Sequence, residues 1–313
     1  MATSKKRKRT RRGRSSAQQS GNPQVRRTAS PKSRLSPFFK LLGEIASAAE
    51  QAIQSTPDPS DQHVRFDVEI LMRGANSVKA TRVLLEQGHW EHAVGVTRQL
   101  FELLVNMEYL GAMEDRGQGT LLFARFGMLQ RLLAQQRTVA YEREMGHPVD
   151  AELAAMVEQH LATDFMDFRA DTKNGSVRWV SSWCRRTTSA LAEASADPMR
   201  PHQYNILYRV WSEQAHAAPG ALIADLFREA DHEWVERAIA ENDRSSIDTL
   251  TFTVMFFLRL WLELPHMQIS PERVAAWLSK LSTMSGGPEL PSRPWTAEEV
   301  TAQPASPAPP AAP

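Results

Sequence analysis

One stretch of the sequence places residues suited to phosphodiester chemistry on a single helical face. The pattern from Tyr204 to His216 has helical period, and its polar positions are Arg209, Ser212, Glu213 and His216. Because Arg209 and His216 are seven residues apart, they lie two turns apart on one face, roughly 10 Å along the axis. An arginine can hold a phosphate and a histidine can move a proton near neutral pH. This pair, oriented by Ser212 and Glu213, is the candidate site for metal-free RNA cleavage.

The same residues also fit an ordinary solvated helix face. Arg209 and Glu213 have the i,i+4 spacing of a surface ion pair, which contributes only a few tenths of a kcal/mol. His216 lies near the end of the predicted helix, where the helix dipole favours a cation. Spacing alone leaves both interpretations open.

A second cation–acid pair, Arg98 and Glu102, interrupts an otherwise apolar helical pattern. With Asn106 it forms a polar strip that we expect to face another helix. The strip is typical of a structural ion pair between packed helices. If it meets the face of Arg209, Glu102 becomes a partner for Arg209 or His216.

No metal or cofactor site is expected. His160, Asp164, Asp167 and Asp171 recur along one stripe of a predicted helix and could supply metal ligands. The neighbouring stripe is apolar, so the acidic row is what an amphipathic helix turns outward. The sequence contains no P-loop, no nucleophile elbow and no His-Glu-x-x-His motif.

Charge is distributed very unevenly along the chain. Residues 1–34 hold 12 of the 37 Lys and Arg residues and no acidic residue, which leaves 25 basic residues against all 36 acidic ones in 35–313. We expect residues 1–34 to be a disordered basic arm that contacts nucleic acid, for which the alternative is a solubilising extension. The candidate contacts are Lys5, Lys6, Arg7, Lys8, Arg9, Arg11, Arg12 and Arg14.

The sequence predicts a soluble cytoplasmic protein. Cys184 is the only cysteine, so a disulfide framework is excluded. No apolar segment follows the basic run as it would in a secretory signal. The most apolar stretch, Leu250–Leu264, is too short to span ~30 Å of hydrocarbon, so no membrane partner is expected.

Helical periodicity predicts an all-α fold, a bundle of long antiparallel helices that forms a single domain over residues 35–285. The Pro- and Ala-rich segment 286–313 is predicted to be a disordered tail. Gly88 is expected to end a helix and Ser270 to cap one. A first helix is predicted from about Phe38 to near Pro57. Further helices are predicted near 61–87, 89–114, 120–145, 150–171, 185–195, 202–216, 219–241, 245–264 and 271–282.

Two blocks of the sequence resemble a bacterial helical family catalogued only as a domain of unknown function. The first runs from Leu84 to Tyr109 and includes Arg98-Gln-Leu-Phe-Glu102. The second is Tyr208-Arg-Val-Trp-Ser-Glu-Gln-Ala-His216. The resemblance covers roughly residues 60–265 and implies a fold and a site location, but no reaction.

A fainter resemblance is to the HEPN superfamily of helical proteins, many of them toxin or antiphage ribonucleases. They carry an Arg and a His on one helix with four to six residues between them, at a dimer interface, and cleave RNA without metal. Six residues lie between Arg209 and His216. If these features are carried over to this sequence, the resemblance implies a HEPN-like core and a homodimer. It also implies that Arg209 and His216 are the catalytic pair and that Glu102 is their polar partner. Val210 and Trp211 replace the small polar residue that usually follows the Arg.

Three functions follow as hypotheses. The first is a HEPN-like, metal-independent endoribonuclease in defence or stress response. The second is a non-catalytic helical module that binds nucleic acid or a nucleotide. The third is a structural or interaction scaffold in which the face of Arg209 and His216 is only a packed polar network.

Overall fold

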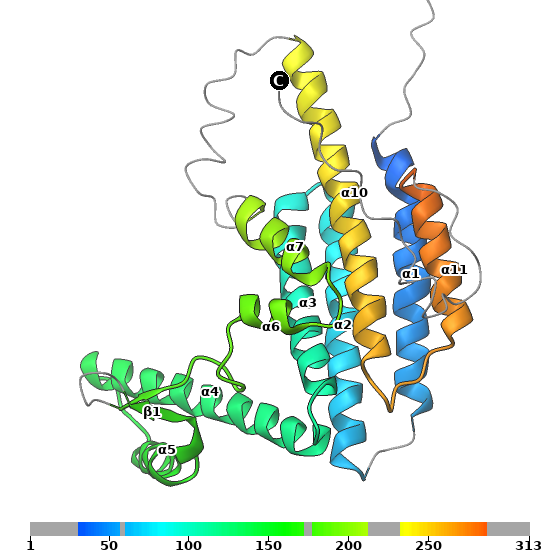
Figure 1. Ribbon diagram of the computed structural model, residues 1–313. Coiled ribbons are helices and arrows are strands. Elements are labelled where there is room, and N and C mark those ends of the chain that lie inside the picture. Colours follow the sequence, from blue (N-terminus) through cyan, green and yellow to red (C-terminus); the bar gives the residue numbers. More distant parts are fainter. Residues whose placement is uncertain (1–30, 57–59, 172–176, 212–231, 287–313) are drawn as a thin grey trace, which may run out of the picture.

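The computed structural model describes residues 31–56, 60–171, 177–211 and 232–286. Within these ranges, five helices lie side by side in the bundle. Each runs antiparallel to the bundle helix next to it in the chain, except for the third and the fourth, which are separated by a long intervening segment and run in the same direction (Figure 1). The bundle helices are α1 (Pro31–Ser55), α2 (Gln62–Glu86), α3 (Trp90–Gly111), α10 (His232–Leu262) and α11 (Pro271–Met284). The predicted all-α class is therefore confirmed.

Local sequence signals set several helix ends. Asp61 accepts a hydrogen bond from the backbone N–H of His63 at the start of α2, and Ser270 accepts one from Arg273 at the start of α11, as predicted for Ser270. Gly88 follows α2 with a φ of 82°, a left-handed conformation that glycine adopts at little cost, which confirms the predicted stop.

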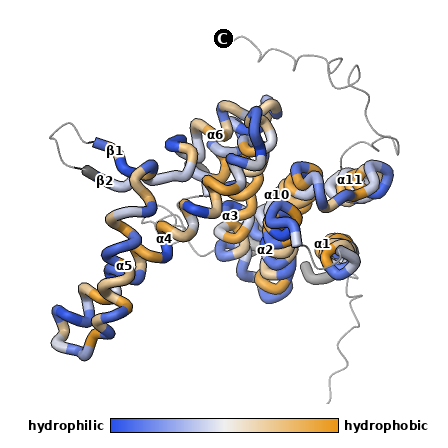
Figure 2. Tube along the Cα trace, turned by 90° about the horizontal axis from the view of Figure 1, so that it is seen from below, coloured by the Kyte–Doolittle hydropathy of each residue, from blue (hydrophilic) through white to orange (hydrophobic). Residues whose placement is uncertain are grey.

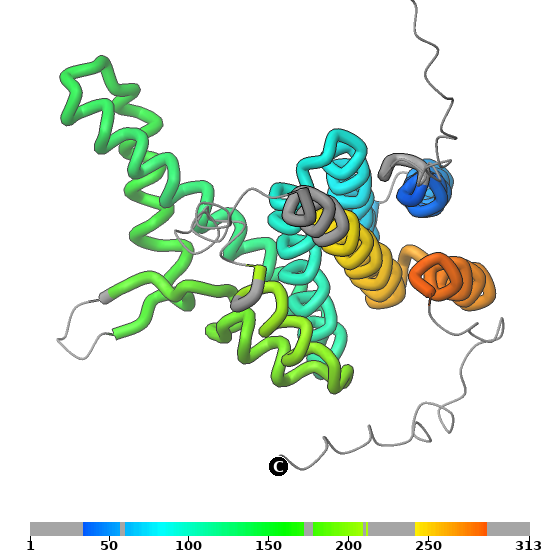
Figure 3. The backbone as a smooth tube through the Cα atoms, turned by 90° about the horizontal axis from the view of Figure 1, so that it is seen from above, coloured from blue at the N-terminus to red at the C-terminus, as the bar shows by residue number. Residues whose placement is uncertain are grey.

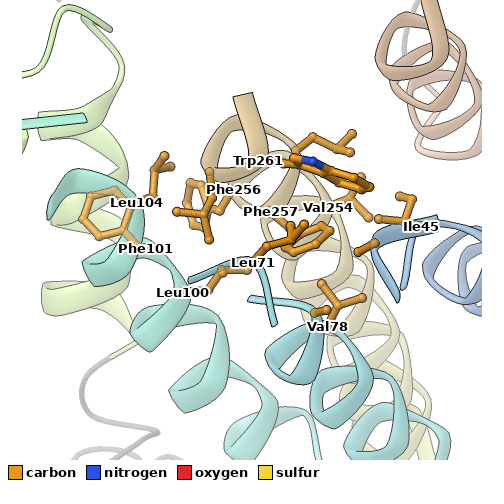
Figure 4. Packing of buried hydrophobic residues seen from close by; sticks show 14 of the residues in the cluster. Ile45, Leu71, Val78, Leu100, Phe101, Leu104, Val254, Phe256, Phe257 and Trp261 are labelled. Carbon is orange, nitrogen blue, oxygen red and sulfur yellow. The ribbon is translucent and has the colours of Figure 1, made fainter. Parts of the chain in front are cut away.

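The main core lies where α1, α2, α3 and α10 face one another (Figure 4). Runs of hydrophobic residues on α1 and α3 coincide with it (Figure 2). At Gly74 of α2 an added Cβ would lie 2.9 Å from side-chain atoms of both Phe257 and Leu260 of α10, so α2 and α10 pack in close approach. The shared core residues in Figure 4 include Ile45, Leu71, Val78, Leu100, Phe101, Leu104, Val254, Phe256, Phe257 and Trp261.

Helix α4 (Arg116–Glu144) leaves the bundle and forms a projecting arm with the elements that follow it (Figures 1 and 3). We call residues 116–179 the α4 arm. Its own small core packs α4 against the next helix and turn, through Leu129, Leu133, Val157, Leu161, Phe165 and Phe168. The remaining elements of the arm are α5 (Ala151–Thr163), the 3-10 turn η1 (Met166–Phe168), β1 (Arg169–Asp171) and β2 (Val177–Trp179).

The predicted helix extents were wrong in three places. The α-helix expected over 202–216 ends at Asn205 and is followed by a π-helical turn, Ile206–Val210. The helix expected over 150–171 ends at Thr163, and the chain then turns into β1, which pairs antiparallel with β2 in the register Arg169 to Trp179. The short strands have too few residues for an alternating pattern to be visible in the sequence. The break expected between 241 and 245 is absent, because α10 runs unbroken from His232 to Leu262.

The second sequence block begins in a compact run of short elements. Helices α6 (Thr188–Ala194) and α7 (Arg200–Asn205) are followed directly by the π-helical turn η2 (Ile206–Val210). These elements lie against α3 (Figure 1). They position Tyr208 and the backbone of Arg209.

Among the described residues, one helical segment is long and apolar enough to cross a membrane, Asn242–Leu262 of α10. About half of its most apolar window, 56%, is buried inside the bundle. A core helix of a soluble protein has these same properties.

Candidate functional site

Helix α3 carries a polar strip on the face opposite its core residues. Arg98, Glu102, Asn106 and Tyr109 lie at i, i+4, i+8 and i+11, and all four are half-buried. We call these four residues the α3 strip. It packs against other elements, as predicted for Arg98, Glu102 and Asn106, and these elements come from the part of the chain after the α4 arm.

The turn η2 brings Tyr208 onto the first part of the strip. The Tyr208 hydroxyl donates a hydrogen bond to Oε1 of Glu102, and the Arg98 guanidinium lies over the Tyr208 ring with Cζ 3.8 Å from its centroid. Arg98 Nε is 3.8 Å from Glu102 Oε1. Burial, together with the hydrogen bond to the Glu102 carboxylate, raises the pKa of Tyr208 far above its ordinary value, so the phenol stays protonated and remains a donor.

The backbone at η2 is itself unusual. The Trp211 N–H donates to the Ile206 carbonyl at 3.0 Å, the i to i+5 bond of a π-helix. The rings of Tyr204 and Tyr208 stack with centroids 4.5 Å apart, and the Trp211 ring meets the edge of Phe252 of α10. Single π-turns of this kind occur frequently at functional sites.

The loop between β2 and α6 covers the second part of the strip. Trp183 is buried there and donates from its indole Nε1 to Oδ1 of Asn106 at 2.6 Å. The Trp183 ring meets the edge of Tyr109 at 5.8 Å, and the guanidinium carbon of Arg186 lies 5.2 Å from the Tyr109 ring centroid. Cys184, beside Trp183, is a half-buried free cysteine.

A buried ion pair ties α7 to α3 next to the strip. Arg200 donates from Nε and Nη2 to the Glu108 carboxylate at 2.7 to 3.1 Å, and from Nη1 to Oε1 of Gln203 at 2.7 Å. Asp197 and Ser195 complete this network, since Asp197 lies 3.2 Å from Nη1 of Arg200 and Ser195 donates to Glu108. Sequence reasoning did not find this pair, because its members are 92 residues apart.

A second buried network was also missed, at the end of the bundle where α4 begins. Asp67 is fully buried in α2 and accepts hydrogen bonds from Arg116 Nη2 at 2.9 Å and from the His266 backbone N–H at 3.2 Å. In addition, His266 Nδ1 lies 2.7 Å from Asp67 Oδ2. One signal was available, because Asp67 falls on the apolar face of its helix, where an unpaired carboxylate is very costly.

The structure brings together part of the predicted site. Arg98 and Glu102 contact Tyr208, the residue before Arg209, and the backbone of Arg209 forms part of η2. Three predicted residues, Ser212, Glu213 and His216, lie outside the described residues. So do the predicted nucleic-acid contacts of the basic arm, Lys5, Lys6, Arg7, Lys8, Arg9, Arg11, Arg12 and Arg14.

The acidic row that was weighed as a metal site does not form one stripe. His160 Nδ1 is 2.6 Å from Asp164 Oδ2, whereas Asp167 lies beyond the end of α5 and pairs with Arg125 at 2.7 Å. Asp171 is on β1. Within the described ranges, no three His, Cys, Asp or Glu side chains are grouped so that they could hold a metal ion.

A comparison with protein families found one match that covers the site. The family model described as "Family of unknown function (DUF5677)" matches residues 68–233, which include α3, the α4 arm and η2. No match was found among curated proteins, and none among solved structures.

Proposed function

The chain belongs to the DUF5677 family of unknown function, and we propose that this member is a metal-independent endoribonuclease whose site lies where α3 meets η2. The observation that carries the proposal is the contact of Tyr208 with Glu102 and Arg98. Through it, the two sequence blocks that resemble the family of unknown function meet in space, and Arg209, the first member of the HEPN-like Arg–His pair, follows directly in the chain.

The proposed chemistry is an intramolecular transfer at phosphorus. His216 accepts the proton of a ribose 2′-OH, the O2′ attacks the adjacent phosphorus, and the bond from phosphorus to the 5′-oxygen breaks. Arg209 stabilises the negative charge that develops on the phosphoryl oxygens. The leaving 5′-oxygen takes a proton from water, and the products are a 2′,3′-cyclic phosphate and a 5′-hydroxyl end.

Glu102 and Arg98 would act as positioning residues in this scheme. Tyr208 donates to Glu102 and stacks under Arg98, so its side chain is held from two sides. This contact restrains the π-turn that carries Arg209. We also propose a cytoplasmic homodimer in which two such faces meet across a two-fold axis.

The test is incubation of purified protein with total RNA in EDTA. We expect the wild type to cleave and to leave 2′,3′-cyclic phosphate ends. His216→Ala should lower the rate by about 10²–10⁴-fold, the range for loss of a general base. Arg209→Ala should lower it by about 10²–10³-fold, as for loss of one group that stabilises transition-state charge.

His202→Ala is the matched control, because His202 is an exposed histidine on α7, close in sequence to the site and without a partner among the described residues. It should cleave like the wild type. If the folded wild type leaves RNA intact, the ribonuclease proposal fails. The two non-catalytic alternatives, a binding module and a scaffold, would then be left.

A further inference from the structure

We propose that a single strand of RNA runs from η2 along the outside of the loop that covers the α3 strip, over the exposed Arg186 and Arg185, toward β1 and β2. The inference rests on the proposed function, because it describes the path that the RNA substrate would take from the proposed ribonuclease site. The strip begins at Arg98 beside Tyr208 and ends at Tyr109 under Arg186. At 1.5 Å per residue the strip is about 16 Å long, so the path beside it from Tyr208 to Arg186 corresponds to about five nucleotides of a stacked strand at 3.4 Å each.

The carboxylates beside this path are already neutralised. Glu102 is contacted by Arg98 and by the Tyr208 hydroxyl, and Glu108 is paired with the buried Arg200. At the hairpin end, Asp167 is paired with Arg125. These three carboxylates therefore contribute little uncompensated negative charge, whereas Asp171 on β1 is an exposed acidic group at the hairpin end.

Two arginines next to these groups keep their positive charge exposed. Arg185 donates to the backbone carbonyls of Asp167 and Arg169 at 2.9 and 3.3 Å, and Arg186 lies over the Tyr109 ring. Both are exposed, and neither has a carboxylate partner within the described part of the chain. Their charge is thus available to phosphate groups.

Stacked guanidinium groups suit a strand whose bases are not paired. Arg186 on Tyr109, and Arg169 at 4.8 Å from the Trp179 ring, are two arginine–aromatic stacks along the same segment. A guanidinium held flat on a ring offers its other face to a base and its edge to phosphate oxygens. Aromatic and cationic groups in alternation are typical of sites for single-stranded nucleic acid.

The net negative charge of the rest of the chain disfavours the binding of duplex RNA. Residues 35–313 have 36 acidic residues against 25 basic ones, so the cationic path is narrow and lies on an acidic body. Duplex nucleic acid carries one negative charge per about 1.7 Å of axis, twice the linear density of one strand. Its second backbone would be brought against the acidic surface.

The experiment measures binding of a uridine dodecamer that carries 2′-O-methyl groups and cannot be cleaved by the proposed route. Fluorescence anisotropy with the full chain gives the affinity at several salt concentrations. Arg186→Gln should weaken binding several-fold and reduce the slope of log affinity against log salt by about 0.7, the value for one phosphate contact on a single strand. Arg186→Lys should keep the slope and still weaken binding, because it keeps the charge and loses the planar stack.

Arg65→Gln is the matched control, since Arg65 is an exposed arginine of α2 without a partner among the described residues. It should bind like the wild type. A 4-thiouridine version of the dodecamer should cross-link to peptides that contain Tyr109 or Trp179. Cross-links confined to residues 1–34, or an affinity unchanged in Arg186→Gln, would overturn the inference.

The two proposals fail in different ways. If the dodecamer binds through Arg186 but total RNA is not cleaved, the path stands and the ribonuclease does not. If cleavage depends on His216 while Arg186→Gln leaves KM and binding unchanged, the ribonuclease stands and the path does not. A matching duplex that binds as tightly as the single strand contradicts the proposed substrate class.

Discussion

Tyr208 is the residue through which the two sequence blocks touch. Its hydroxyl donates to Glu102, its ring carries Arg98 on one side, and Tyr204 stacks against it. The raised pKa of Tyr208 keeps the phenol protonated well beyond the neutral range, so the hydroxyl remains the donor in this contact at neutral pH. A pH-dependent rate in the proposed reaction would therefore have to come from another group, and His216 is the proposed one.

Glu263, just after the end of α10, is a partly buried residue for which the structure predicts an effect of pH on stability. Burial, and then repulsion from Glu108, raises the pKa of Glu263 despite nearby arginines. Because the folded state binds this proton more tightly than the unfolded chain does, stability falls as pH rises through the raised pKa. Glu263→Gln should therefore raise the free energy of unfolding at about pH 8 and change it little at about pH 4.

Urea denaturation at the two pH values measures this difference. Glu69→Gln is the control, since Glu69 is an exposed carboxylate on α2 without a partner among the described residues. It should change the free energy of unfolding by less than about 0.5 kcal/mol. A loss of stability in Glu263→Gln at about pH 8 would mean that the attraction of the nearby arginines outweighs the burial of the charge.

At the scale of elements, α7 and η2 depend on α3 for their position. Helix α6 has seven residues and α7 has six, too few for either to be stable alone. The Arg200 side chain is 2% exposed and the Glu108 side chain 9% exposed, so the pair that joins α7 to α3 is almost fully out of water. Through this pair the location of Tyr208 and of the Arg209 backbone is coupled to α3.

Arg200→Met should lower the free energy of unfolding by about 3–5 kcal/mol, because it leaves Glu108 buried without its partner. Arg143→Met is the matched control, since Arg143 and Glu158 form an exposed ion pair in the α4 arm with 55% and 58% exposed side chains. It should cost at most about 1 kcal/mol. Equal effects of the two substitutions, measured by urea denaturation, would show that the ion pair of Arg200 and Glu108 does not hold α7 against α3.

At the scale of the whole molecule, the α4 arm has its own small core beside the main bundle (Figure 3). Its link to the bundle includes the buried Asp67, which accepts from Arg116 at the first residue of α4. Since the bundle core and the arm core are separate clusters, the arm can open locally while the bundle remains folded.

Leu129→Ala tests that independence, because Leu129 is fully buried in the core of the arm. It should cost about 2–5 kcal/mol, as for other buried Leu truncations. Hydrogen exchange of the α5 amides should become faster while that of α2 and α3 is unchanged. Met128→Ala, at the adjacent position with a 58% exposed side chain, should change neither. Faster exchange in α3 as well would show that the arm and the bundle unfold together.

Much of this architecture could be predicted from the sequence because it depends on local patterns. Helical period marks the all-α class, and the polar positions Arg98, Glu102 and Asn106 stand out in an apolar helix as a strip that must face something other than the core. Gly88 and Ser270 mark helix ends through backbone freedom and side-chain capping, which involve only near neighbours in the chain. The extents of α5 and α10 were mispredicted, since helix boundaries depend on what the ends pack against.

Only the tertiary structure decided what meets the strip. Tyr208 reaches Glu102 across 106 positions, Arg200 reaches Glu108 across 92, and Trp183 reaches Asn106 across 77. Such pairs leave no periodic trace in the sequence, because each is created by the packing of helices that are distant in the chain. The physical reason is that burial makes an unpaired polar group costly without specifying which residue will pair with it.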